Sequence, residues 1–119
     1  MLERFTAERR ISDANRAYLD TLIVTLAGRM AEIDRALQAA LTNWRIERLS
    51  TIDRNILRLG GAEILFLDDV PPRVSIQEAI LLAEKYGTRE SPRFVNGVLD
   101  ALMRQAGRAA GVGEAGDRR

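Results

Sequence analysis

Apolar residues recur at three- and four-residue spacing along most of the chain, which is the signature of amphipathic helices. No segment alternates apolar and polar residues as a half-buried strand does. Glycine and proline fall mostly between the periodic segments, where they end helices. The pattern therefore predicts an all-α fold, a compact bundle of about five helices with short connections.

The first half of the chain predicts two helices in close succession. The first is expected to begin at Ser12 or Asp13, both good N-caps, and to run to Gly28. The second follows at once and ends near Trp44. Gly28 therefore marks either a kink or a true break.

The third predicted helix is capped by Ser50, with Asp53 in a variant of the capping box. The segment that follows is apolar on most sides, which is typical of a helix in the middle of a bundle. Gly60 and Gly61 lie inside it, where each is less favourable than alanine by about 1 kcal/mol. We expect these glycines to let another helix approach closely.

Two further helices follow the helix-breaking Pro71 and Pro72. The fourth is expected to begin near Ser75, which has capping-box spacing to Glu78, and to end at Gly87. The fifth is expected to begin after a Ser91 cap, with Pro92 at its first position. The expected division is an N-terminal segment over residues 1–11, a helical domain over 12–106 and a disordered tail over 107–119.

Composition removes most catalytic classes. The chain has no cysteine and no histidine, which excludes disulfides, the common zinc sites, thiol nucleophiles and histidine-based triads. The formal net charge of +1 argues against a protein coated in positive potential, so any contact with nucleic acid must be local. We expect no enzymatic activity, no cofactor and no metal site.

The chain carries no feature of a membrane or secreted protein. No apolar run approaches the ~20 residues of a membrane span, and the first residues lack the apolar core of a signal peptide. We therefore expect a soluble cytoplasmic protein.

One carboxylate falls on an apolar face. Glu63 lies about 20° around its helix from Ile52, on the side where a buried residue is expected. A buried carboxylate needs a hydrogen-bond donor. We expect an internal pair with an arginine or with the cap of a neighbouring helix.

A polar and aromatic cluster spans the predicted end of the fourth helix and the start of the fifth. It contains Tyr86, Arg89, Arg93, Phe94 and Asn96. Aromatic rings can stack on bases, and arginines can bind phosphates or stack, so the cluster is suited to single-stranded RNA. The competing interpretation is that the aromatics belong to the core and the arginines are solvated.

The run from residue 43 to residue 100 resembles the NusB family of bacterial transcription antitermination factors. The resemblance rests on NWRIERLSTIDRNILRL and on EILFLDDVPPRVSIQEAILLAEKYGTRESPRFVNGVLD, whose motifs stand in the family's order and spacing. It implies an all-α, NusB-like fold without enzymatic activity. It also implies pairing with the ribosomal protein NusE, binding of boxA-type single-stranded RNA, and assembly of an antitermination complex on RNA polymerase during rRNA transcription.

The resemblance also implies roles for individual residues. Arg93, Phe94 and Asn96 match positions near the RNA, and Glu90 matches an acidic position that modulates that contact. Asp53 matches an acidic position on the partner-facing surface. With Arg89 from the polar and aromatic cluster, the candidate RNA-binding residues are Arg89, Glu90, Arg93, Phe94 and Asn96, and the candidate partner-binding residue is Asp53.

The N-terminal part departs from the family. The sequence MLERFTAERRI is too short for the family's first two helices, which include an arginine-rich segment. Either RNA affinity is reduced, or an in-frame segment upstream of Met1 encodes these helices. Without them we expect Leu22, Val24 and Leu26 to be exposed and the chain to form a homo-oligomer, because large apolar patches mark interfaces.

Two other functions remain open from the sequence. One is a truncated paralogue that keeps only protein–protein interaction. The other is a detached RNA-binding domain of an rRNA methyltransferase, in which a related helical domain precedes the catalytic one.

Overall fold

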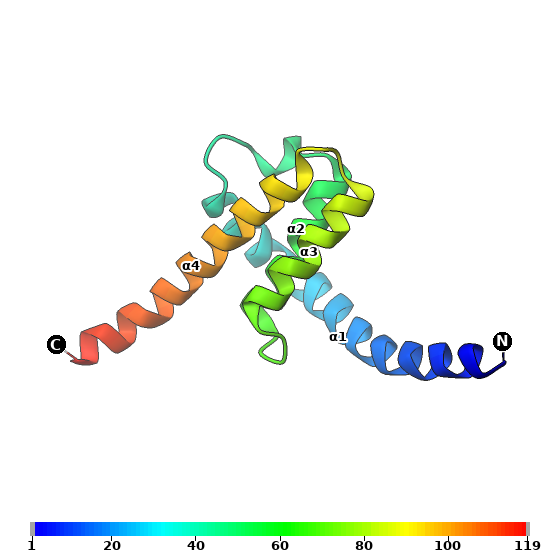
Figure 1. Ribbon diagram of the computed structural model, residues 1–119. Helices are drawn as coiled ribbons and strands as arrows, with labels where there is room; N and C mark the ends of the chain where they lie inside the picture. Colours follow the sequence, from blue (N-terminus) through cyan, green and yellow to red (C-terminus); the bar gives the residue numbers. More distant parts are fainter. Residues whose placement is uncertain (1, 119) are drawn as a thin grey trace.

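The computed structural model describes the backbone of residues 2–118 and the side chains of residues 16–107. Within these residues the chain is all-helical, as predicted, but it has four α-helices rather than about five (Figure 1). They are α1 (Leu2–Ala40), α2 (Thr51–Phe66), α3 (Pro72–Tyr86) and α4 (Ser91–Arg118), with a 3-10 turn, η1 (Ile46–Arg48), between α1 and α2.

The difference in number arises in α1, because the two helices expected on either side of Gly28 are joined. The backbone at Arg29 is not helical, with φ −124° and ψ 16°, so the join is a kink rather than a break. The guanidinium of Arg29 lies 5.1 Å from the centre of the Phe66 ring on α2. The expected start at Ser12 or Asp13 was wrong, since α1 begins upstream of both.

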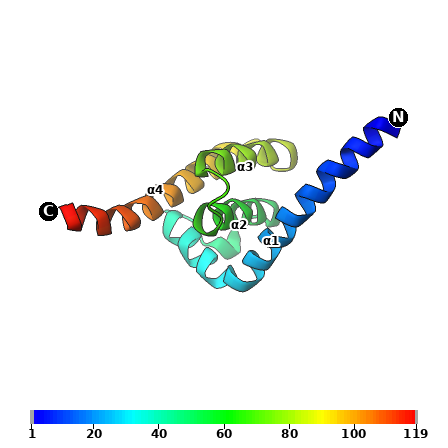
Figure 2. The same ribbon diagram turned by 90° about the horizontal axis from the view of Figure 1, so that it is seen from below.

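Helix α2 lies at the centre of the fold, as its apolar surface predicts. It contacts the second half of α1 on one side and both α3 and α4 on the other (Figure 2). The Ser50 hydroxyl accepts a hydrogen bond of 3.1 Å from the Asp53 amide, which confirms the predicted cap. A Cβ atom placed on Gly60 would lie 2.7 Å from Leu99 Cδ1 of α4, so the predicted close approach of a second helix is also confirmed.

The predicted start of α3 was wrong by three residues. The helix begins at Pro72, which occupies the first turn, where its missing amide hydrogen removes no hydrogen bond. Ser75 is consequently inside the helix, where it is buried and its hydroxyl has no partner, so the capping box with Glu78 does not form. Gly87 follows the last helical residue, as expected.

The start of α4 differs from the predicted cap by one residue. Ser91 is the first helical residue, and its hydroxyl accepts a hydrogen bond of 2.9 Å from the Thr88 amide in the preceding turn. The Phe94 amide bonds instead to the Glu90 carbonyl, at 3.1 Å. Helix α4 runs on to Arg118, over residues for which the sequence predicts a tail. The side chains after residue 107 lie outside the described part, and the domain division stays a prediction.

The core lies where α2 meets the other three helices. Its fully buried side chains include Ile33 and Leu37 of α1, Leu57 of α2, and Leu99 of α4. The described helices include none that is long and apolar enough to cross a bilayer.

The N-terminal end of α1 projects away from the core (Figure 1). Val24 is 70% exposed, as expected, and Leu26 is half-buried. Leu22 is buried, so its expected exposure was wrong. Leu19 and Ile23 are exposed instead. Formation of a homo-oligomer through this face stays a prediction.

Candidate nucleic-acid interface

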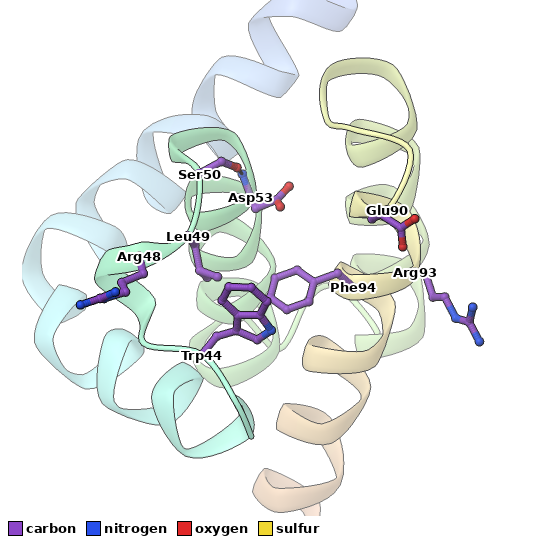
Figure 3. Close-up of a pocket in the computed structure, with 8 residues that line it drawn as sticks. All are labelled: Trp44, Arg48, Leu49, Ser50, Asp53, Glu90, Arg93 and Phe94. Atoms are coloured by element: carbon purple, nitrogen blue, oxygen red, sulfur yellow. Dashed lines mark hydrogen bonds between the residues drawn. The ribbon is translucent and has the colours of Figure 1, made fainter.

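A groove of about 540 Å³ opens between the segment that follows α1 and the start of α4 (Figure 3). The connecting segment supplies Trp44 and Leu49, and α4 supplies Phe94. The remaining lining residues are polar: Arg48, Ser50, Asp53, Glu90 and Arg93.

This groove brings together four of the six residues predicted from the sequence. Glu90, Arg93 and Phe94, predicted to bind RNA, share it with Asp53, predicted to bind a partner. Two predicted RNA-binding residues do not line it. Arg89 lies exposed in the turn before α4, and Asn96 is exposed about 200° around α4 from Phe94.

Two aromatic side chains meet across the groove. In Figure 3 the indole of Trp44 and the ring of Phe94 point toward one another, with Leu49 beside them. Trp44 is 56% exposed, whereas Phe94 is half-buried and packs against the core. Tyr86 is exposed but lies outside the groove lining, and the Lys85 ammonium lies 5.4 Å from the centre of its ring.

A second hollow of about 350 Å³ continues from the first. It shares Trp44, Arg93 and Phe94 with the groove. The end of α1 and the segment after it form one further wall, with Ala40, Leu41 and Thr42. Small or apolar residues of α4 form the other: Gly97, Val98 and Ala101. The aromatic pair therefore stands between two adjoining concave surfaces, of which only the groove also carries carboxylates.

The segment that carries Trp44 is held by one side chain. The amide of Gln38, on the last turns of α1, donates a hydrogen bond of 2.8 Å to the carbonyl of Trp44. Its carbonyl oxygen accepts a hydrogen bond of 2.9 Å from the amide of Ile46. Gln38 thus bonds to the backbone at Trp44 and two residues beyond it, and Ile46 is buried in the core.

The charges of the groove are balanced. Arg48 and Arg93 are opposed by Asp53 and Glu90. Among the residues whose side chains are described, neither arginine forms an ion pair, and in Figure 3 their guanidinium groups point outward on opposite sides of the aromatic pair. Asp53 stands at the start of α2, where a carboxylate is favoured by the helix dipole, and its Oδ1 is buried without a partner.

A different pair satisfies the carboxylate of Glu63. Tyr18 of α1 donates its hydroxyl hydrogen to Glu63 Oε2, so the donor does come from a neighbouring helix, but it is neither an arginine nor a helix cap. Burial, followed by the hydrogen bond and the negative charge of Glu63, raises the pKa of Tyr18 above its usual range. Neither residue lines the groove, and the pair joins α1 to α2.

The sequence analysis missed several lining residues, of which Trp44 is the largest. The available signal was a tryptophan at a predicted helix end, between the polar residues Asn43 and Arg45. Such a position leaves an indole outside any apolar stripe. Arg48 carried no comparable signal, because its place in the groove depends on η1.

Comparisons with known proteins identify the family. The NusB family model matches residues 1–104. A "Transcription antitermination protein NusB" from Sorangium cellulosum is 47% identical over 93 residues, which cover 78% of this chain and 66% of that protein. A protein of the same name from Desulfosudis oleivorans is 40% identical over 106 residues, which cover 89% of this chain and 69% of that protein.

A solved structure supports the same assignment. The structure of T. maritima NusB is 42% identical in sequence and superposes with a TM-score of 0.68, over 71% of this chain and 59% of that chain. The chain thus spans about two thirds of the length of the two named relatives and 59% of the chain in the solved structure. The match of the family model to most of the sequence, together with these identities, shows that the chain belongs to the NusB family.

Proposed function

We propose that this chain is a transcription antitermination factor that binds boxA-type single-stranded RNA together with the ribosomal protein NusE. The relatives cited above carry the name of transcription antitermination proteins, which supports the general role. In this proposal the complex joins an antitermination assembly on RNA polymerase and acts through binding alone.

The observation that carries the proposal is the position of the aromatic pair between two arginines. Trp44 and Phe94 meet across the groove, and Arg48 and Arg93 extend outward on either side of them. Aromatic faces suit unpaired bases, and guanidinium groups suit phosphates. A single strand that crosses the groove can satisfy both kinds of contact at once.

The two carboxylates of the groove have different roles in this proposal. The negative charges of Asp53 and Glu90 repel phosphates and favour a cationic partner. We assign Asp53 to the contact with NusE. Glu90 lies one helical turn from Arg93 and Phe94, where its charge weakens an RNA contact without preventing it.

Titration of a labelled boxA-type RNA tests the proposal, with and without NusE, at two salt concentrations. We expect saturable binding that NusE strengthens. The Arg93→Ala variant should bind more weakly, with a salt slope smaller in magnitude by about 0.7, because one phosphate contact is lost. Asp53→Asn should lower the gain from NusE and leave the binding of RNA alone nearly unchanged.

The matched control is Arg73→Ala, which removes an exposed arginine from the start of α3, whereas the groove lies near the other end of that helix. Its RNA affinity and salt slope should equal those of the unaltered chain. Equal losses in both arginine variants would mean that binding is non-specific. Capture of NusE without any RNA binding would favour the truncated paralogue that keeps only protein interaction.

A further inference from the structure

We infer that Trp44, with Phe94 opposite, forms a stacking site for one unpaired nucleobase of single-stranded RNA. The inference rests on the proposed RNA-binding function and names the residue that holds the base. Trp44 was not among the residues predicted from the sequence, and it is the only tryptophan of the chain.

The exposure of Trp44 is the first argument. An indole is large and mostly apolar, and such side chains are usually well buried. Trp44 is 56% exposed, although the core lies directly behind the loop at Ile46 and Leu41. Tryptophans left exposed in concave surfaces are typical of binding sites.

The loop that carries Trp44 is held in place, which is the second argument. Gln38 bonds both to the Trp44 carbonyl and to the Ile46 amide, so the backbone around the exposed indole is fixed from both sides. A backbone that is already ordered lowers the conformational entropy lost when a ligand binds. The backbone that carries the exposed indole is therefore in place before the ligand binds.

The surroundings indicate a base rather than an apolar side chain of a protein. Hollows of about 540 Å³ and 350 Å³ lie against the same two rings, which leaves room for a planar group beside them. The arginines on both sides can bind phosphates before and after the stacked nucleotide. An aliphatic side chain would need neither flat faces nor guanidinium groups.

Because no other tryptophan is present, fluorescence excited at the long-wavelength edge of the indole band, where the two tyrosines do not absorb, reports on Trp44 alone. We would titrate an unlabelled boxA-type single-stranded RNA and follow this fluorescence. The same complex would be followed in parallel by the anisotropy of an end-labelled RNA. Stacking should quench the fluorescence, with a midpoint equal to that of the anisotropy curve.

Substitutions then measure the contribution of the ring. Trp44→Leu should weaken RNA binding about 5- to 150-fold, the range expected for the loss of one stacked base. Trp44→Phe should keep part of the affinity. The control is Leu81→Ala, which removes a large apolar side chain of α3 that is about as exposed as Trp44 and lies outside the groove, and which should leave RNA affinity unchanged. Circular dichroism and thermal melting of each variant verify the fold.

The outcomes separate this inference from the function on which it rests. RNA binding without quenching, or with the same affinity in Trp44→Leu, overturns the stacking site while RNA binding stands. Quenching by NusE alone and not by RNA assigns the site to a protein side chain and also overturns it. Absence of RNA binding, with and without NusE, overturns both proposals.

Discussion

The two adjacent glycines of α2 allow a matched pair of substitutions with opposite expected effects. Gly60 and Gly61 are both buried and helical, so replacement by alanine improves the helix propensity of each by about 1 kcal/mol. Their surroundings differ. We therefore expect Gly61→Ala to stabilise the fold and Gly60→Ala to leave it unchanged or destabilise it.

At Gly61 the added methyl group finds space. A Cβ atom there would lie 3.4 Å from Ile33 Cγ2, 3.5 Å from Leu37 Cδ2 and 3.6 Å from Leu102 Cδ2, which are close but ordinary contacts. The gain in propensity combines with the burial of one methyl group, worth up to about 0.8 kcal/mol. We expect a net stabilisation of about 1–2 kcal/mol, or roughly 4–8 °C in Tm.

At Gly60 the added methyl group collides with α4. The Cβ atom would lie 2.7 Å from Leu99 Cδ1 and 3.3 Å from Cδ2. Leu99 is fully buried, so its side chain has little room to move. Overpacking of this kind costs about 1–3 kcal/mol, which offsets or exceeds the gain in propensity.

Urea denaturation followed by circular dichroism measures both variants against the unaltered chain. The unfolding free energies should differ by about 1–4 kcal/mol between the two variants, with Gly61→Ala the more stable and with equal m-values. Equal stabilisation of both variants would refute the reasoning, because it would mean that α4 does not press against α2 at Gly60.

Three further results are expected. Replacement of Glu90 by glutamine removes a negative charge from the groove and should raise RNA affinity about 1.4- to 5-fold in an anisotropy titration; unchanged affinity would place the RNA elsewhere. Two hydrogen bonds of 2.9 Å between Arg58 and Asp34 join α2 to α1, so Asp34→Asn should lower the unfolding free energy by about 1–2 kcal/mol. The same substitution made in an Arg58→Met variant should cost less, because the partner is already absent. The raised pKa of Tyr18 in the fold means that the unfolded chain releases this proton first as pH rises, so stability should fall above about pH 10, and less steeply in Tyr18→Phe.

The helical class and several helix ends could be predicted because local chemistry decides them. The hydroxyl at Ser50 and the apolar run after it indicate the same start for α2, and the structure agrees. At Ser75 two local signals competed, a capping serine and a proline suited to the first turn, and the proline at position 72 prevailed. The kink at Arg29 could be placed near Gly28, but the choice between kink and break depends on how both halves pack.

The groove was only partly predictable because it is built from contacts between distant segments. Phe94 and Arg93 belong to a recognisable cluster at a helix start, whereas Trp44 reaches the same place from a loop about 50 positions earlier. The partner of Glu63 is also distant in sequence, 45 residues toward the N-terminus. Periodicity identified Glu63 as a residue in need of a donor and could not say which residue supplies it.

The kink in α1 divides one helix into two parts of unequal local stability. After Arg29 the side chains of Ile33 and Leu37 are fully buried, so amide hydrogens of that half open to solvent only when the whole domain unfolds. Before it, Leu22 is buried and Tyr18 bonds to Glu63 of α2, but Leu19, Ile23 and Val24 face solvent, so fewer side chains hold this part of the helix against the core. Hydrogen exchange should therefore be slow in the second half and faster between Tyr18 and Gly28, where protection rests on Leu22 and the Tyr18–Glu63 pair.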